Sequence, residues 1–444
     1  MSPVPHSSVR KCIIRPIAFV AAFFIFLFTF EFLFLRLDPR TFCTFENLRN
    51  MDDLELVVVG NSMAAANLDP DVLDECLDTN SFLLTKSASI SYCATTMAQY
   101  LFKNGHRPSR MILMFDPTFA QYQREDLSVL TTFVPFLSLA DRINYTIKTA
   151  DKDDLWLDRI FPIRTQCVTS FEEFWNDLVG KFFPDKIYAE KAAAISGMYS
   201  YAGRGHTPYS EWTNEASLAD GSHRLSDKTY SSLPSHVEKE IKEIAALCEQ
   251  YNCKLIFTTT PIIRNKALAQ KELLSACNAM SDFCKENGYT YINFTYMRPE
   301  YMPDYNIDSY YDKGDHLHGS VVPSFTRDVY CRVLKDLYSG KDIDHYFYTY
   351  EEWLESIDFI SDAWFTSKNA NGQVTYTAYA HCGPLVKPLF RFVSVDQDGH
   401  ETILRDYSEE QNFSINASDL TGTIRLYALN AANTEQDTIL YELP

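Results

Sequence analysis

The sequence predicts an α/β protein built on a parallel sheet, with an N-terminal membrane helix, a helical insertion and a C-terminal antiparallel β-sandwich. An almost unbroken apolar stretch covers residues 16–36. Short apolar runs alternate with amphipathic helical segments over residues 50–340, which is typical of βαβ units. After about residue 367 short alternating segments separated by turn residues follow, the pattern of a small sandwich.

Length and composition limit the classes of function. A chain of 444 residues with 46% apolar residues can form two or three packed domains. Its net charge of -19 leaves no basic surface for a phosphate backbone, so we expect no nucleic-acid binding. The mean hydropathy of -0.21 excludes a polytopic membrane protein. Eleven cysteines include no Cys-x-x-Cys pair, so neither a zinc ribbon nor a thioredoxin motif is predicted, and disulfide pairing stays open.

The N-terminal apolar stretch predicts one membrane-spanning helix. It runs over Ile17–Leu35, close to the ~20 residues that cross a bilayer core, and only Glu31 interrupts it. Basic residues favour the cytoplasmic side, and the preceding segment holds Arg10, Lys11 and Arg15. We therefore expect a cytoplasmic tail over residues 1–15, a transmembrane helix over 16–36, and the bulk of the chain outside the cytoplasm at the cell membrane.

A cleaved signal peptide is the alternative for this segment. Its apolar region usually runs about 7–15 residues and ends at a small-x-small cleavage site. Here the stretch is longer, and the RLDPRTFCTF that follows contains no such site. The uncleaved anchor is therefore favoured. Glu31 lies near the outer end of the helix, where we expect its carboxylate to reach the lipid headgroups.

The α/β region is predicted from apolar runs and amphipathic helices. Buried parallel strands are expected at 54–59, 110–115, 254–259 and 289–294. Helical spacing of apolar residues precedes the last two, at 236–252 and 268–288. Between about 117 and 230 the rhythm fails, which predicts a helical insertion lying over the sheet as a cap. We expect a linker helix over 341–366 and the sandwich over 367–444.

The first candidate site follows the first predicted strand, in the run VVVGNSM. Ser62 would stand at the carboxyl end of this strand, where open α/β sheets bind ligands. Gly60 allows a tight turn, and the helix that follows would direct backbone N–H groups at an anion beside Ser62. An ordinary helix N-cap serine is the alternative, and this motif taken alone favours it.

The second candidate site is DKGDHLH at 312–318, which precedes the last predicted helix of the α/β region. A carboxylate that holds an imidazole allows histidine to act as a general base. The alternatives are a solvated turn and a metal site. Such a metal site would use Asp312, Asp315, His316 and His318, and it lacks further clustered ligands because the other histidines are scattered singly.

Together the two segments resemble the SGNH/GDSL hydrolase superfamily. The closer resemblance is to its membrane-anchored bacterial branch, related to the D-alanine transfer protein of teichoic acid modification and to polysaccharide O-acetyltransferases. Over roughly residues 50–340, VVVGNSMAAANLDP resembles the first block and LIFTTTP the late strand ending in Thr-Pro. DSYYDKGDHLHGSVVPSFT resembles the block written D-x-x-H-L-N. The resemblance implies a three-layer α/β/α, flavodoxin-like fold.

By position, the resemblance implies Ser62 as the nucleophile and His316 as the general base. His-Leu and the downstream Phe-Thr fall at the family's spacing from His316. The family's Asp, three residues before the histidine, is Lys313 here, so the acid stays open. Asp312 with His316 is the preferred pair. Asp315 and His318, which have the three-residue spacing, are the second pair.

The oxyanion hole departs from the family's pattern. The first-block Asp is Asn61 here, and no clear Gly-x-Asn-Asp block occurs near Phe115-Asp116. We expect the oxyanion to rest on the backbone N–H groups of Ser62 and Ala88, with Asn61 as a further donor. Because losing one such donor typically costs about 10²–10³ in turnover, a degenerate enzyme is an open alternative.

The resemblance and the predicted anchor imply a membrane-anchored, extracytoplasmic serine esterase or O-acyltransferase that acts on cell-surface glycans or cell-wall polymers. The expected partners are an acylated or acyl-accepting glycan, the membrane, and a membrane-bound acyl donor. No cofactor and no metal are expected. The alternative from another class is a non-catalytic surface or assembly protein on a degenerate SGNH scaffold.

Overall fold

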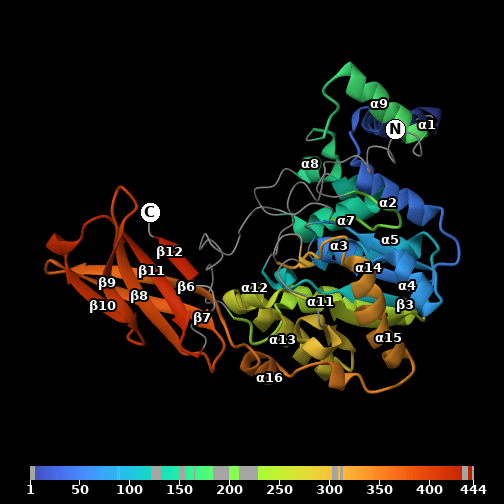
Figure 1. Ribbon diagram of the computed structural model, residues 1–444. Coiled ribbons are helices and arrows are strands. Elements are labelled where there is room, and N and C mark those ends of the chain that lie inside the picture. The colour runs from blue at the N-terminus through green and yellow to red at the C-terminus, as the bar shows by residue number, and fades with distance from the viewer. Residues whose placement is uncertain are drawn as a thin grey trace.

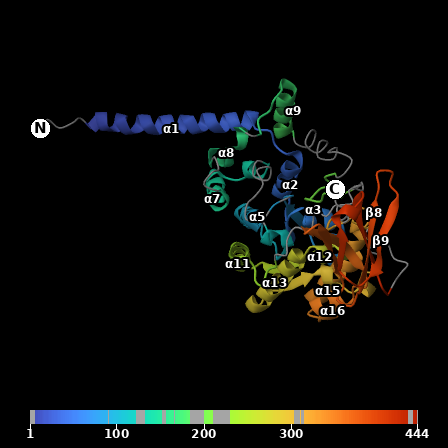
Figure 2. The same ribbon diagram turned by 90° about the vertical axis from the view of Figure 1, so that its left-hand side faces the viewer.

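A computed structural model gives the arrangement of the chain (Figure 1). It describes residues 6–87, 89, 91–121, 132–150, 156–164, 166–183, 200–209, 229–302, 309–310, 314–432 and 439–442. An α/β body carries a long N-terminal helix at one end and a β domain at its side (Figures 1 and 2).

The N-terminal helix α1 (His6–Phe34) projects away from the body (Figure 2). Its segment Ile14–Phe34 is long and apolar enough to cross a membrane, and 6% of the apolar window within it is buried. The short helix α2 (Pro39–Arg49) follows after a turn in which the Asp38 side chain accepts the N–H of Thr41. This cap marks the start of α2, where the chain leaves α1 and enters the α/β body.

A parallel sheet forms the centre of the α/β body. In the described part of the chain its order is β2-β1-β3-β4-β5, with every neighbouring pair parallel. The strands are β1 (Leu56–Gly60), β2 (Ser81–Thr85), β3 (Arg110–Met114), β4 (Lys254–Thr259) and β5 (Tyr291–Asn293). Four of these confirm the predicted strands, whereas β2, a short SFLLT run, was not predicted.

Helices cover both faces of this sheet. Alternate strand residues enter two separate apolar clusters, with Val57 and Val59 in one and Leu56 and Val58 in the other. The first face is covered by α5 (Ser91–Lys103), α11 (Ser235–Gln250) and part of α13 (Lys271–Asn287). The second is covered by α3 (Ser62–Asn67), α4 (Pro70–Leu77), α12 (Arg264–Ala269) and α15 (Cys331–Tyr338). Strands buried on both faces explain the continuous apolar runs in the sequence.

The helices of the α/β region begin and end where their residues favour it. The two helices predicted before the late strands are confirmed as α11 and α13, and Gly288 ends α13 with φ +71°. That left-handed conformation suits glycine. The last predicted helix is continuous through α14 (Val322–Ser324), the π-helical segment η7 (Phe325–Tyr330) and α15.

The described parts of the segment between β3 and α11 consist largely of short helices. This segment contains the short turns η1 (Pro117–Ala120), η2 (Val134–Phe136) and η3 (Pro162–Arg164), and the helices α7 (Leu139–Thr149), α8 (Trp156–Ile160) and α9 (Phe171–Phe182). Of the described helices, α8 and α9 lie beside the C-terminal end of α1 rather than over the sheet, in contrast to the expected cap (Figures 1 and 2). Phe161, Phe174 and Phe182 contact α1 there. Helix α7 packs on α5, and its Tyr145 joins the apolar cluster on the first face of the sheet.

The short segment 200–209 forms backbone hydrogen bonds with the sheet and with α3. Its Arg204 carbonyl accepts the N–H of Leu83 in β2 at 3.0 Å. The Thr207 N–H donates to the carbonyl of Ala65 in α3 at 2.8 Å. This segment therefore lies at the carboxyl edge of β1 and β2.

A linker helix and a β domain complete the chain. Helix α16 (Tyr350–Glu355) begins with a capping box between Thr349 and Glu352. The first strand after it begins at Ile360, before the expected boundary at residue 367, because its apolar residues already pair with β7. The strands are β6 (Ile360–Ala370), β7 (Gln373–Cys382), β8 (Pro388–Val395), β9 (Glu401–Ser408), β10 (Asn412–Asn416), β11 (Thr423–Asn430) and β12 (Ile439–Glu442).

These strands form two antiparallel sheets, β10-β7-β6 and β12-β11-β8-β9, over the described residues. The aromatic rings of Phe365, Tyr376 and Phe392 meet between the sheets and centre their common core. On the other side, β6 and β7 lie against α12 of the α/β body. The β domain is thus joined to the body beside a helix that follows β4.

Candidate active site

Ser62 lies at the carboxyl end of β1, as the first residue of α3. Gly60, two residues before Ser62, is required because of close packing rather than because of the expected tight turn. A Cβ atom on Gly60 would lie 2.8 Å from the Met114 Cβ and 3.0 Å from the Ala64 Cβ. Contacts this short are not tolerated, so glycine allows β1, β3 and α3 to approach one another and fixes the position of Ser62.

Asn61 caps α3 and connects it to the neighbouring strand. Its Oδ1 accepts the N–H of Met63 at 3.1 Å, and its Nδ2 donates to the carboxylate of Asp116, which follows β3. Asp116 also accepts the N–H of Thr118 at 2.8 Å. Burial and then the nearby charge of Asp315 raise the pKa of Asp116. The Nδ2 group has a second N–H besides the one that bonds to Asp116, and the expected role of Asn61 as an oxyanion donor stays a prediction.

His316 connects Ser62 to a buried carboxylate. Its Nε2 lies 2.8 Å from the Ser62 Oγ, and its Nδ1 lies 3.1 Å from the Asp315 Oδ1. If Nδ1 carries the proton and donates to Asp315, Nε2 presents its lone pair to the serine hydroxyl. The side chain of His316 is 17% exposed, so this contact is accessible from solvent. A hydroxyl, an imidazole and a carboxylate therefore form one continuous chain of contacts.

Lys266 completes the chain from α12. Its Nζ lies 2.9 Å from the Asp315 Oδ2, opposite the oxygen that faces His316. Burial opposes the ionisation of Asp315, but the positive charges of Lys266 and then His316 outweigh it. They hold the pKa of Asp315 well below its usual range. The carboxylate therefore keeps its negative charge next to the imidazole.

Asn67, at the end of α3, holds the backbone on both sides of His316. Its Nδ2 donates to the Asp315 carbonyl at 2.7 Å, and its Oδ1 accepts the Leu317 N–H at 2.7 Å. The same Nδ2 donates to the Thr260 Oγ1 at 2.8 Å, just after β4. Asn67 is fully buried. It links α3, which carries the serine, to the loop that carries the histidine.

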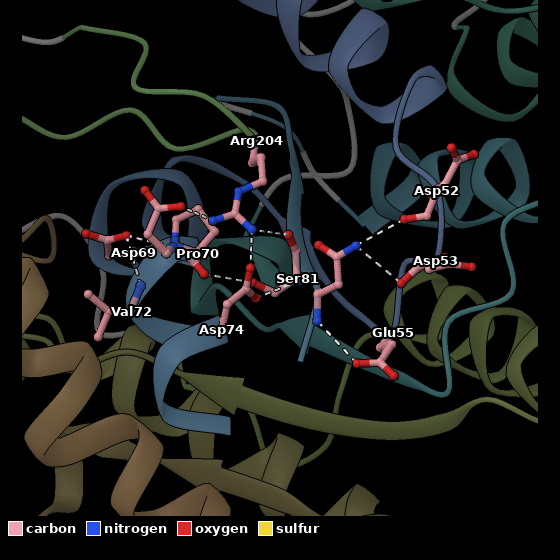
Figure 3. Close-up of polar contacts among 11 residues, drawn as sticks. Asp52, Asp53, Glu55, Asp69, Pro70, Val72, Asp74, Ser81 and Arg204 are labelled. Carbon is pink, nitrogen blue, oxygen red and sulfur yellow. Dashed lines mark hydrogen bonds and ion pairs between the residues drawn. The ribbon is translucent and has the colours of Figure 1, made fainter. Parts of the chain in front are cut away.

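The segment 200–209 borders the site. The ring of Tyr209 lies edge-on to the ring of His316, with 5.3 Å between the centroids. Arg204 fixes this segment, because its guanidinium bonds to the carboxylates of Asp71 and Asp74 and to the carbonyl of Ser81 (Figure 3). The two acidic side chains come from α4, so this ion pair ties the border of the site to the helix beside β2.

The structure brings together Ser62, His316 and Asp315 among the predicted site residues. Asp315 contacts His316, whereas the second candidate pair was Asp315 with His318. The His318 Nδ1 lies 2.7 Å from the Ser320 Oγ. Asp312, the preferred acid, and Ala88, an expected oxyanion donor, lie outside the described residues. The acid role of Asp312 therefore stays a prediction.

Sequence reasoning missed Lys266, Asn67 and Asp116. Lys266 is one of several basic residues near the end of the LIFTTTP run, and no local pattern distinguishes it. Asn67 and Asp116 do carry a signal, because each is a polar residue in or just after an apolar run at the carboxyl edge of a strand. Buried polar residues at that edge could have been added to the candidates.

The arrangement of Asp315 also bears on the metal alternative. One of its oxygens faces His316 and the other the ammonium of Lys266. A cation already in contact with the carboxylate repels a second one, which disfavours a divalent metal at this position. In the described part of the chain, a three-residue group with metal-binding chemistry is formed by Asp396, Asp398 and His400, all exposed in the turn between β8 and β9.

Comparisons with known proteins do not assign this site. No model of a protein family matches the chain, and no curated protein matches it. The chemistry of the site must therefore be argued from its own geometry.

Proposed function

We propose that the protein is a membrane-anchored serine ester hydrolase or O-acyltransferase of the SGNH type, acting outside the cytoplasm. The observation that carries this proposal is the chain of contacts from Ser62 through His316 to Asp315, at the carboxyl edge of a parallel sheet. A serine whose hydroxyl contacts an imidazole oriented by a carboxylate is the arrangement of nucleophilic acyl transfer.

Each step then follows from the geometry. The Ser62 Oγ attacks the ester carbonyl carbon while the His316 Nε2 takes the hydroxyl proton, and Asp315 stabilises the imidazolium that forms. The oxyanion is held at the start of α3 by the N–H of Ser62. The imidazolium gives its proton to the leaving alkoxide as the C–O bond breaks, which leaves an acyl-serine. Water or a sugar hydroxyl, deprotonated by His316, then releases the acyl group and restores the serine.

The contacts at the C-terminal end of α1 support the proposal that this helix is an uncleaved membrane anchor. Glu31 does not reach toward lipid headgroups as expected: its Oε1 lies 2.6 Å from the Arg142 Nη1 of α7, and both side chains are buried. Cleavage after the apolar stretch would remove Glu31 and leave the arginine buried without its ion pair. Such a loss is costly, so the folded body favours keeping α1.

The β domain supports a glycan as substrate. On the outward side of β6 and β7, the rings of Trp364 and Tyr379 stack with 5.4 Å between centroids and 19° between planes. Aromatic faces of this kind pack against the C–H faces of sugar rings. The same strands lie against α12, the helix that carries Lys266. A glycan on this surface would lie close to the site.

A non-catalytic surface protein is the second candidate. The observation that favours it is Asn61, whose Nδ2 donates to Asp116 and whose Oδ1 caps α3. With one N–H of this amide held by Asp116, the side chain offers the oxyanion at most one donor beside the backbone N–H groups. A scaffold of this kind can keep the fold while losing turnover.

One set of variants distinguishes the two candidates. The full chain in detergent micelles is tested for hydrolysis of p-nitrophenyl acetate and for labelling by a fluorophosphonate. We expect Ser62→Ala to abolish labelling, and both Ser62→Ala and His316→Ala to lower kcat by on the order of 10⁴–10⁶. Ser324→Ala, at an exposed serine, is the control. Hydrolysis that persists in Ser62→Ala contradicts the proposal.

His318→Ala in the same series tests the histidine assignment. Because the His316 ring lies against Ser62, we expect His318→Ala to retain labelling at Ser62. Wild-type chain that neither hydrolyses the ester nor takes the label would favour the non-catalytic candidate.

A further inference from the structure

Exposed apolar side chains are concentrated in one part of the body. Between α1 and the β domain, the large apolar residues that are well exposed in the described structure all fall within residues 143–183. The most exposed are Leu157 at 71%, Phe171 at 75%, Phe182 at 62% and Phe183 at 58%, and Trp156 and Trp175 are half exposed. Contiguous exposed apolar surface of this kind marks an interaction site.

This surface is continuous with the membrane-spanning segment. Ring contacts join the two, with 6.2 Å between the centroids of Phe28 and Phe161 and 5.7 Å between those of Phe32 and Phe182. Phe28 and Phe32 both belong to the apolar segment Ile14–Phe34. The helices α7, α8 and α9 therefore surround the outer end of α1 (Figures 1 and 2). We name residues 139–149, 156–164 and 166–183 the collar.

Polar contacts hold the collar rigidly on α1. The Lys181 Nζ donates to the carbonyls of Phe32 and Leu35, at 2.6 Å each, and so satisfies acceptors that the end of a helix leaves open. The buried ion pair between Glu31 and Arg142 adds a second connection. The collar therefore cannot move along the helix axis or rotate around it independently of α1.

A cavity lies at the junction of α1, α2 and the collar. It has a volume of about 540 Å³ and is lined by Phe28, Phe32 and Phe182, with Arg142 and Lys181 among its polar lining. Its apolar lining includes residues of the segment Ile14–Phe34. The charged residues of the lining are in ion pairs, Arg142 with Glu31, Lys181 with Asp177 and Arg49 with Glu46.

We propose that the collar lies in the outer leaflet of the membrane and places its exposed aromatic side chains among the lipids. The proposal rests on the proposed anchor, because it takes α1 to span the bilayer. Tryptophan and other aromatic residues favour the interface between hydrocarbon and headgroups. Because the collar is fixed on α1, it holds the α/β body at one height and orientation above the membrane. The body is not carried on a flexible stalk.

Tryptophan fluorescence of the full chain tests this surface. The protein is reconstituted into phosphatidylcholine vesicles with or without bromine atoms on the acyl chains, which quench nearby indoles. We expect brominated lipid to quench the wild-type emission, and Trp156→Phe/Trp175→Phe to lose most of that quenching. Trp364→Phe, in the β domain, is the matched control and should keep it. Phe replacements at exposed positions keep the apolar surface and the fold.

The outcomes separate the collar from the anchor. Equal fractional quenching in wild type and in Trp156→Phe/Trp175→Phe, with the protein still in the vesicles, overturns the collar's place in the leaflet. Wild-type emission that brominated lipid does not quench also overturns it. Lipid then does not reach these residues, as when a second copy of the chain or another protein covers them. Loss of the protein from the vesicles during flotation after alkaline washing overturns the anchor and the inference that rests on it.

Discussion

The adjacency of Asp315 and His316 poses a geometric problem at the scale of single residues. Consecutive side chains in an extended segment point to opposite sides, yet here the carboxylate contacts the imidazole that follows it. The backbone must therefore bend between them. Asn67 provides the restraint by bonding on both sides of His316, and the Ile263 N–H fixes the Gly314 carbonyl at 2.8 Å. The orientation of the histidine depends on these bonds.

Lys266 provides the charge that keeps Asp315 ionised. The native pKa of Asp315 is lowered, so its ionisation stabilises the fold above the ordinary unfolded pKa of about 3.9. That contribution is lost as the pH falls through the native pKa. We predict that Lys266→Met lowers the free energy of unfolding by roughly 1–3 kcal/mol at pH 7, since a buried charge loses its partner. The loss should shrink in acid and disappear only as the pH falls through the lowered native pKa of Asp315, where the wild-type carboxylate is protonated too. Denaturant unfolding in micelles, at pH 7 and at decreasing pH in acid, measures this loss in the free energy of unfolding.

Lys266→Arg is the matched control for this prediction. It keeps a positive charge within reach of the Asp315 carboxylate and should retain most of the stability at pH 7. The pH dependence of the difference separates the charge from simple packing. A Lys266→Arg variant that loses as much stability as Lys266→Met at pH 7 would mean that the charge of the lysine is not what stabilises the fold.

The site could be predicted from sequence only in part, for physical reasons. Ser62 and His316 stand in local patterns, a polar residue after a buried strand and a histidine beside acids. The partners of Asp315 could not be chosen in this way. Whether it faces His316, His318 or Lys266 depends on backbone bends fixed by Asn67, which lies 248 residues away in the chain. A spacing rule contains no such information.

At the scale of elements, burial of both faces decided which strands were visible in the sequence. β1 and β3 each have four consecutive apolar residues, whereas β2 and β4 have three with polar residues at both ends. β4 could still be predicted because an amphipathic helix precedes it. Ser81 is buried because its Oγ donates to the Pro70 carbonyl and its N–H to Asp74. A polar residue satisfied in this way breaks the apolar pattern without breaking the strand.

The end of α1 is stabilised by an ion pair between elements. Besides Glu31, the Arg142 guanidinium bonds to the carbonyls of Leu137, Ile160 and Pro135. The guanidinium group therefore connects α7 to the segments that precede and follow it. The sequence could not pair two residues 111 positions apart, and its apolar pattern suggested that Glu31 faces lipid headgroups. In the structure, Glu31 instead pairs with Arg142 and so connects α1 to the collar.

We predict that Glu31→Leu lowers the thermal stability of the full chain in micelles more than the double variant Glu31→Leu/Arg142→Leu does. The single variant leaves a buried charge uncompensated, which typically costs about 3–5 kcal/mol, whereas removing both charges does not. Glu46→Leu is the control, because its partner Arg49 has a side chain 58% exposed and such pairs contribute little. A double variant as unstable as Glu31→Leu would argue against the pair as the main connection.

At the scale of the whole molecule, three parts converge on the site. The sheet presents Ser62, the helix that follows β4 presents Lys266, and the β domain lies on the other side of that helix. The alternation along β7 sends Val374, Tyr376 and Ala378 into the core and Tyr379 outward. The outward face also carries hydroxyl groups, since the Thr375 Oγ1 lies 2.8 Å from the Ser414 Oγ. Aromatic and hydroxyl groups together suit a sugar polymer.

We predict that Trp364→Ala/Tyr379→Ala raises KM for an O-acetylated chitooligosaccharide and leaves p-nitrophenyl acetate hydrolysis unchanged. Aromatic pairs in proteins are worth about 0.5–1.5 kcal/mol beyond their buried area, and the loss of a contact of this size with a sugar ring would raise KM roughly two- to tenfold. Initial rates on the two substrates measure the effect. The small ester is unaffected because it needs only the contacts at Ser62 and His316. Leu385→Ala, at an exposed apolar residue of the same domain, is the control. A KM that rises equally for both substrates, or for neither, would separate the β domain from substrate binding.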